Sequence, residues 1–477
     1  MQTRKFKGGA YATIISAMMI IVVIIVNLIF TKLNFTFDMT LEGKYSLTEE
    51  TIEMLGELDD EITFYYLASS GEGIDLFDKI LSQYTKYGEN ITLVYKDPLL
   101  NPKFASQYTS ATPQEYSIIV VNETNGRSRY IPYTNMLVEE YSMDPTTYEY
   151  ATEVTGIDME GQLNSAIGYV TTEHLPTLYE VSGHGMQTLG TEALALLEKA
   201  NIVVNSGDNS LDLLSTTKIP EDCDVLLLYT PQTDFTESEV AVLSDYMQNG
   251  GNLIFVLSYL NVQHPNLLQL VEQYGIELQD GVLLEENTRN YMQYPYMLLP
   301  NVVAHELTSG ISNNKYVIGQ ASSALKISED SATDLTMLAT ATGILETSNS
   351  AYIKDVNVSS YTKEEGDPTG KYYVGIYVED YETKAEMAVF SSAYIFNDAY
   401  ASTSTFGNLN LLVNCVNVLS DAEDTTTAVR TISLQDDNYL VLTEAQINII
   451  GLCTVIILPL AVLIAGIVFV VYRRKHA

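Results

Sequence analysis

The sequence predicts an α/β protein in which a doubly wound parallel sheet follows a smaller α/β unit, with a transmembrane helix on either side. Three observations lead to this prediction. Residues 175–300 alternate apolar strands with amphipathic helices, the pattern of right-handed βαβ units. Residues 35–150 contain a second, shorter succession of helices and strands. A charge-free apolar stretch lies near each end of the chain.

Composition excludes several classes of protein. The 477 residues include 61 acids and 24 bases, for a formal net charge of −37. Such a surface repels phosphates and excludes nucleic acid as a partner. With 46% apolar and 18% charged residues, the chain is not a disordered acidic tail. Its cysteines, Cys223, Cys415 and Cys453, lack metal-ligand spacing, so neither a disulfide framework nor a cysteine metal site is expected.

The two apolar stretches predict membrane helices. The first, 11–31, follows a basic tail at 1–10. Its twenty uncharged residues from 11 to 30 would form a helix of about 30 Å, the thickness of a bilayer core. The second, 447–472, precedes a basic tail at 473–477. Because both basic clusters lie on the terminal side, the positive-inside rule predicts a two-pass cell-membrane protein. Both termini would be cytoplasmic, the bulk of the chain extracytoplasmic, and the lipid bilayer a partner.

Residues 35–150 predict the N-terminal domain. Ser-Leu-Thr-Glu-Glu at 46–50 has the form of a helix N-cap and first turn,. A strand, a helix, two further strands and a hairpin turn follow, and this order predicts a thioredoxin-like α/β unit. It contains no cysteine, which excludes a redox role. Residues 139–156, rich in Thr, Tyr, Glu and Asp, are expected to form a connecting loop.

Residues 157–300 predict the doubly wound domain. A helix at 159–174 leads into it, and the apolar segments TLYEVSG, CDVLLLYTP and NLIFVLSYL alternate with helices, as in a parallel sheet buried on both faces. Residues 301–430 predict a C-terminal α/β extension with paired strands and one helix. Residues 431–446 are expected to be a polar stalk.

The sharpest local motif is Ser182-Gly183-His184-Gly185, directly after the TLYEV strand. Ligands of parallel sheets bind at the carboxyl ends of strands, and glycines allow close backbone approach. These four residues are therefore a candidate binding loop for a small anion or a partner. The alternative is a tight structural turn whose histidine is hydrogen-bonded to its neighbours.

No catalytic motif accompanies this loop. The chain lacks G-x-S-x-G, H-E-x-x-H and the Walker G-x-x-x-x-G-K-[ST] pattern,. Ser258 follows a strand without a glycine turn, and Cys223 precedes its strand. We therefore expect no catalytic residues, no metal site and no cofactor, with an unrecognised active site as the alternative.

Five segments, in this order, resemble the GldG-like auxiliary component of gliding-motility-type ABC transporters. They are KYSLTEETIEMLGELDDEITFYYLAS (44–69), NPKFASQY (101–108), EGQLNSAIGYVTTEHLPTLYEVSGHGMQTL (160–189), IPEDCDVLLLYTPQTDFTESEVAVLSDYMQNGGNLIFVL (219–257) and FGNLNLLVNCVNVLSD (406–421). One departure is Met186, which stands where the family often has an acid.

The resemblance implies a membrane-anchored, non-ATPase subunit that works with an ABC permease and a cytoplasmic ATP-binding subunit. It also implies that the doubly wound domain is class I glutamine amidotransferase-like, or flavodoxin-like, without catalytic residues. Two other functions compete with this one: a stand-alone surface protein that binds or senses a ligand, and a membrane-tethered hydrolase.

Overall fold

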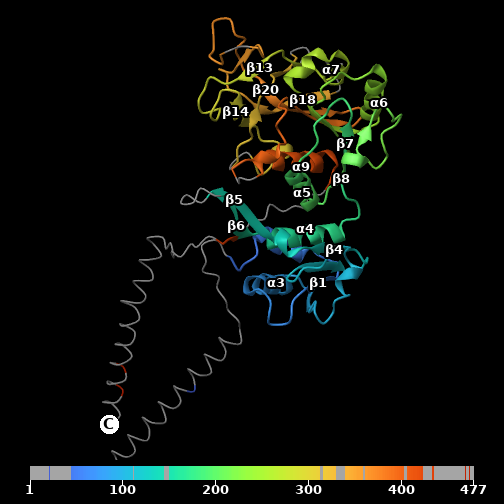
Figure 1. Cartoon of the computed structure of the whole chain (residues 1–477), viewed down its shortest axis with the longest axis vertical. Coiled ribbons are helices and arrows are strands. Elements are labelled where there is room, and N and C mark those ends of the chain that lie inside the picture. The colour runs from blue at the N-terminus through green and yellow to red at the C-terminus, as the bar shows by residue number, and fades with distance from the viewer. Residues whose placement is uncertain are drawn as a thin grey trace, which may run out of the picture. The chain divides into compact units, whose positions relative to one another are not determined.

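The computed structural model describes residues 44–110, 112–143, 150–311, 315–328, 339–357, 360–401, 405–422 and 432–434, with the single positions 21, 468 and 472. Its contacts divide the chain into two units, residues 48–431 and a unit of 1–47 with 432–477. Within the first unit (Figure 1), we call residues 48–157 the small lobe and residues 175–422 the sheet domain. The short strand β22 (Ile432–Ser433) belongs to the other unit.

The small lobe is built on a four-stranded sheet of order β2-β1-β3-β4, in which β1 pairs in parallel with β2 and antiparallel with β3. Helix α2 begins at Thr48, whose hydroxyl accepts the N–H of Thr51 as an N-cap,. The elements are α2 (Glu49–Gly56), β1 (Ile62–Tyr66), α3 (Asp75–Tyr87), β2 (Ile91–Tyr95), η1 (Ala105–Gln107), β3 (Ile118–Asn122), β4 (Ser128–Ile131), η2 (Tyr133–Met136), β5 (Leu137–Met143) and β6 (Tyr150–Ile157).

The sheet domain follows helix α4 (Met159–Thr171). Its first half contains β7 (Thr177–Ser182), α5 (Thr191–Lys199), β8 (Val203–Asn205), η3 (Gly207–Asn209), β9 (Leu211–Asp212), β10 (Val225–Tyr229), α6 (Glu237–Gln248), β11 (Asn252–Val256), η4 (Tyr259–Gln263), α7 (Pro265–Glu272) and β12 (Ile276–Leu278). Its second half contains β13 (Val282–Leu284), β14 (Met297–Leu298), β15 (Asn301–Val302), η5 (Glu306–Thr308), β16 (Gly319–Gln320), β17 (Leu325–Ile327), β18 (Ala339–Glu346), β19 (Tyr352–Lys354), β20 (Tyr373–Asp380), β21 (Glu386–Phe390), η6 (Asp398–Tyr400) and α9 (Asn408–Leu419).

One large sheet organises this domain. Its order is β12-β17-β20-β21-β11-β10-β7-β8, and the five strands from β21 to β8 are parallel. Strand β20 then pairs antiparallel with β21, and β17, β18 and β12 continue antiparallel. The sheet is therefore mixed, and its parallel half is completed by β21, which lies more than a hundred residues after β11 in the chain.

The core lies on both faces of the parallel half. Leu227 of β10 packs into a cluster with α5 and α9, whereas Leu226 and Leu228 pack into a second cluster with α6 and α7. This alternation follows from the period of two along a strand. Figure 1 shows α5 and α9 side by side, away from α6 and α7.

The predicted fold class and localisation need correction. A membrane span needs about 20 apolar helical residues, whereas α3 and α4 have only 13 each. In the part of the chain that the structure describes, no helix is long and apolar enough to cross a membrane. This finding overturns the two flanking helices and the two-pass membrane localisation. Except at three single positions, the segments 11–31 and 447–472 lie outside the described residues. The fold is α/β with mixed sheets.

Helix α4 connects the two lobes through its polar side chains. On the small-lobe side, Asn164 accepts a hydrogen bond from the Tyr84 hydroxyl at 2.6 Å and donates to Thr51 Oγ1 at 2.7 Å. Glu160 Oε1 accepts the N–H of Thr48 at 2.7 Å. Both α4 side chains are almost completely buried, so each bond forms where water cannot replace it.

The opposite side of α4 holds the end of α5. Ser165 Oγ donates to the Lys199 carbonyl at 2.6 Å, and Asn201 Nδ2 donates to the Ser165 carbonyl at 2.9 Å. Asp158, just before α4, pairs with the Lys199 ammonium at 2.5 Å. The same helix therefore fixes elements of both lobes.

Replacing Asn164 with alanine is expected to lower the free energy of unfolding by about 2 kcal/mol, because the buried Tyr84 and Thr51 hydroxyls each lose a partner. Urea unfolding of the chain measures this loss. The control is Gln162→Ala on the same helix; Gln162 is partly exposed and its side chain contacts Asp158, so it should change stability by less than about 0.5 kcal/mol. Equal losses in both variants would contradict this role of α4.

Candidate functional site

Three loops meet where the parallel strands β7, β10 and β11 end. The loop after β7 is tied to the loop after β10, because Gln187 N–H donates to Tyr229 O at 3.0 Å and Gln232 N–H donates to His184 O at 2.7 Å. The loop after β10 is tied to β11 by a bond from Thr230 N–H to Val256 O at 2.9 Å. The candidate residues from the sequence therefore lie at the sheet edge where α/β proteins place their ligands.

His184 is held by both of its ring nitrogens. Nδ1 lies 3.1 Å from Thr233 Oγ1, and Nε2 lies 2.7 Å from Glu239 Oε1. The ring also packs on Phe235, with the ring centroids 4.6 Å apart. Only 9% of the His184 side chain is exposed. The imidazole is thus engaged within the chain and does not point at Ser182.

Glu239 is the residue that fixes His184, and sequence reasoning missed it. Its other oxygen, Oε2, accepts the N–H of Thr236 at 2.8 Å as one half of the capping box of α6,. Burial alone would raise the pKa of Glu239, but hydrogen bonds from Thr236 and His184 outweigh it and hold this pKa below its ordinary value,. The T-x-x-E pattern signals the cap, whereas nothing local signals the contact with His184.

The two glycines of the loop have the left-handed backbone conformation, which glycine adopts more easily than other residues. Gly183 has φ +88° and Gly185 has φ +65°, and a Cβ on Gly185 would meet the Gln232 side chain at 3.1 Å. Between them His184 is also left-handed, at φ 51°, a conformation that costs an L-residue about 1–2 kcal/mol. The bonds at its ring and carbonyl hold it in this conformation.

A second polar cluster lies behind the third loop. Asn261 Oδ1 accepts the N–H of Ser258 at 2.6 Å, which orients the amide so that Nδ2 donates to His264 Nδ1 at 3.0 Å,. The Ser258 hydroxyl also donates to Asn261 Oδ1, and this serine is 2% exposed. Burial lowers the pKa of His264, so this ring is neutral and its Nδ1 accepts a hydrogen bond.

In these arrangements, the two histidines bind other side chains of the protein, His184 binding Thr233 and Glu239 and His264 binding Asn261. Neither Ser182 nor Ser258 has a histidine base among its hydrogen-bond partners in the described part of the chain. Burial raises the pKa of the Cys223 thiol to about 12, so the thiolate that would act as a nucleophile does not form at neutral pH. Among the described residues, no group of three or more His, Cys, Asp or Glu is placed to hold a metal ion.

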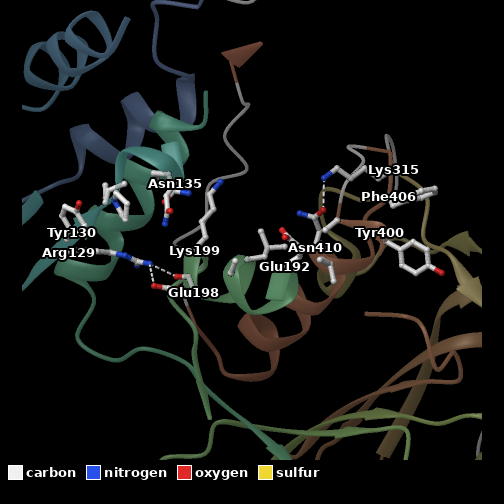
Figure 2. Close-up of a pocket in the computed structure, with 17 residues that line it drawn as sticks. Arg129, Tyr130, Asn135, Glu192, Glu198, Lys199, Lys315, Tyr400, Phe406 and Asn410 are labelled. Atoms are coloured by element: carbon white, nitrogen blue, oxygen red, sulfur yellow. Dashed lines mark hydrogen bonds and ion pairs between the residues drawn. The ribbon is translucent and has the colours of Figure 1, made fainter. Parts of the chain in front are cut away.

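A cavity of about 660 Å³ lies elsewhere, between the small lobe and the sheet domain. Figure 2 shows Arg129 and Glu198 on one side of it and Lys315 with Asn410 on the other. Arg129 donates to the Glu198 carbonyl at 2.9 Å and contacts Asn201 Oδ1. Lys315 donates to Asn410 Oδ1 at 2.8 Å. None of these residues was a candidate in the sequence, because they come from segments far apart in the chain.

Replacing Glu239 with glutamine is expected to lower the free energy of unfolding at pH 7 by about 1–2 kcal/mol. The glutamine keeps only one side-chain oxygen, so one of the groups that donate a hydrogen bond to the Glu239 carboxylate loses its acceptor. The folded pKa of Glu239 lies below the usual 4.5, so the carboxylate stabilises the fold above that pH and this contribution is lost as the pH falls through the folded pKa. Urea midpoints measured between pH 7 and pH 3.5 should show the difference shrinking. Glu237→Gln, an exposed neighbour in the first turn of α6, is the control. A difference independent of pH would contradict the assignment.

Replacing Gly183 with alanine is expected to lower stability by about 1 kcal/mol through backbone strain, because the nearest atom to a new Cβ is 3.9 Å away and adds no clash,. Thermal denaturation of the chain measures the loss. Gly56→Ala, in a helix with open space around it, is expected to leave stability unchanged or raise it. If the two variants behaved alike, the left-handed turn would not be what the glycine provides.

Comparison with solved structures finds partial likenesses. A chain titled "mmIFT52 N-terminal domain" is 17% identical, with 51% of this chain and 97% of that chain covered and a TM-score of 0.38. The "Cytoplasmic Protein STM3548 from Salmonella typhimurium" is 13% identical, with 51% and 98% covered and a TM-score of 0.31. The β-galactosidase from Bacillus circulans sp. alkalophilus is 9% identical, with 56% and 34% covered and a TM-score of 0.26. No curated protein matches the chain.

Two family models match the sequence. Residues 42–139, which include most of the small lobe, match a domain of unknown function (DUF7088). Residues 181–415 match the family described as an ABC-type uncharacterized transport system. This second match extends from the end of β7 into α9, across almost the whole sheet domain. Over residues 181–415 the chain is therefore similar to the family of ABC-type transport systems, and this match supports an auxiliary component of an ABC transporter.

Proposed function

We propose that the protein is a non-ATPase auxiliary subunit that binds an ABC permease and its cytoplasmic ATP-binding subunit and catalyses no reaction of its own. The family match over residues 181–415 carries this proposal. The GldG-like character is a finer assignment that rests on the order of the five sequence segments. The acidic composition, 61 acids against 24 bases, suits a protein partner with basic surface groups.

The network at the strand ends supports the absence of catalysis. A general base must lie next to the nucleophile that it activates, and among the described residues His184 binds Thr233 and Glu239 rather than Ser182 or Ser258. The Ser258 hydroxyl, which follows the buried strand β11, donates to an amide oxygen. The loop is better suited to holding its own shape than to binding a reacting group.

The small lobe offers a surface for a protein partner. Leu99 and Leu100 are 89% and 78% exposed, which makes them the most exposed large apolar side chains among the described residues. Asp97 holds their backbone outward, since its Oδ1 accepts both N–H groups at 2.7 and 3.2 Å and its Oδ2 accepts the Ser69 hydroxyl at 2.8 Å. Two adjacent leucines that are exposed to water, on a backbone held by hydrogen bonds, are typical of an interaction site.

A stand-alone binding protein is the second candidate, and the cavity between the lobes favours it. A pocket of about 660 Å³ is within the size range of small-molecule sites. A hydrolase is the third candidate, although no observation at the strand ends favours it. The three functions differ in what the isolated chain does.

Co-purification distinguishes the three candidate functions. The proposal predicts that genes for a permease and an ATP-binding subunit neighbour the gene of this protein. A tagged chain co-expressed with these two subunits is expected to purify with both, whereas the chain alone should neither bind nor hydrolyse ATP. Leu99→Asp with Leu100→Asp should reduce recovery of the partners at least tenfold by placing charges in the contact. The control is Leu214→Asp, a leucine that is 66% exposed on the sheet domain and should leave recovery unchanged.

Two results would contradict the proposal. If the chain purified without either subunit under every condition but captured a small molecule, it would be a stand-alone binding protein. If the isolated chain hydrolysed esters or amides, and His184→Ala removed that activity without changing the melting temperature, it would be an enzyme.

A further inference from the structure

The cavity between the lobes contains a lysine whose charge is not balanced. Lys315 is half-buried on its wall, and its ammonium donates to the neutral amide oxygen of Asn410 at 2.8 Å. In the described part of the chain, no carboxylate lies within ion-pair distance of it. Burial lowers the pKa of Lys315, as expected for a cation removed from water without a counter-charge.

Two other lysines in the described part of the chain are paired with carboxylates. The Lys354 side chain, 3% exposed, lies 2.8 Å from Glu364 and 3.3 Å from Asp367. Lys199, on another part of the cavity wall, lies 2.5 Å from Asp158. In a protein with 61 acids, a half-buried lysine that faces a cavity and has only an amide partner leaves room for an acid supplied from outside.

The neighbouring groups complete an anion subsite. Asn410 and Leu409, in the first turn of α9, line the same cavity, and the N-cap residue Gly407 offers no side-chain cap. By contrast, α5 and α7 receive carboxylates from distant loops: Asp398 accepts the N–H groups of Glu192 and Ala193, and Asp234 accepts those of Asn266 and Leu267. The positive end of α9 therefore adds to the ammonium of Lys315.

Apolar side chains form another part of this wall, which Glu192 also lines. Phe406 and Tyr400 line the cavity with their rings 5.8 Å apart, and Leu409 lies beside them. Figure 2 shows Lys315, Asn410, Phe406 and Tyr400 grouped on one side of the cavity. The Tyr400 hydroxyl donates to Gln320 at 3.1 Å, so this residue offers the cavity mainly its ring.

We propose that this cavity binds an organic carboxylate, with the acid group on Lys315 and Asn410 and an apolar portion against Phe406, Tyr400 and Leu409. One ammonium and one amide suit a single negative charge better than a phosphate dianion, which is usually held by several cations or a bidentate arginine. The proposal rests on the cavity alone and is independent of the partner subunits.

Lysine labelling on the full chain tests it. Phenylacetate is expected to slow acylation of Lys315 at least tenfold, as measured by mass spectrometry, while the exposed Lys326 keeps its rate as an internal control. Phenylacetamide, the uncharged analogue, should protect neither lysine. Equal protection by the amide, stronger protection by inorganic phosphate, or no protection by phenylacetate would overturn the proposal.

Two variants make the test independent of labelling. Lys315→Met keeps the length of the side chain and should weaken phenylacetate binding in calorimetry at least tenfold without lowering the melting temperature; Lys103→Met, at an exposed position, is its control. Asn410→Asp would supply the missing carboxylate from within the chain, and should raise the melting temperature and abolish binding. If Asn410→Asp bound phenylacetate as well as the original chain, the assigned position of the acid group would be wrong.

Discussion

The described structure depends on the buried hydrogen bonds along helix α4. Asn164 and Glu160 hold the first two helices of the small lobe, while Ser165 and Asp158 hold the end of α5. Each of these groups would be costly to bury without its partner, so the helix has one position relative to both sides. With α4 in this position, β4 and α5 lie on two walls of the cavity between the lobes.

Short sequence patterns are sufficient to predict some of the strands and helices. The strands β7, β10 and β11 follow from short apolar runs, and α6 follows from its capping box. The hairpin of β5 and β6 was predicted as a loop because its polar residues lack an apolar alternation; the described side chains at 152–154 are exposed. The paired strands of the C-terminal extension were predicted and form β20 and β21, but their place in the same sheet as β11 was not predicted, since strand pairing depends on partners far away in the chain,.

The candidate site shows the same limit. The sequence placed Ser182–Gly185 at a strand end, where the structure also has them. It could not supply Glu239, which is 55 positions from His184, or join Lys315 to Asn410 across 95 positions. Whether a lysine has a carboxylate partner depends on which side chains lie near it in the folded chain. The total of 61 acids therefore does not show which lysine has no such partner.

The place of β21 in the sheet affects how the chain can be synthesised. Residues 253–256 of β11 pair in parallel with residues 387–390 of β21, so β11 has an open edge until the ribosome has made almost 400 residues. An unpaired apolar strand is a template for wrong pairing and aggregation, and contacts so distant in sequence form slowly. Nascent chains that stop near residue 300 should therefore need a chaperone, whereas chains that extend past α9 can bury this edge themselves.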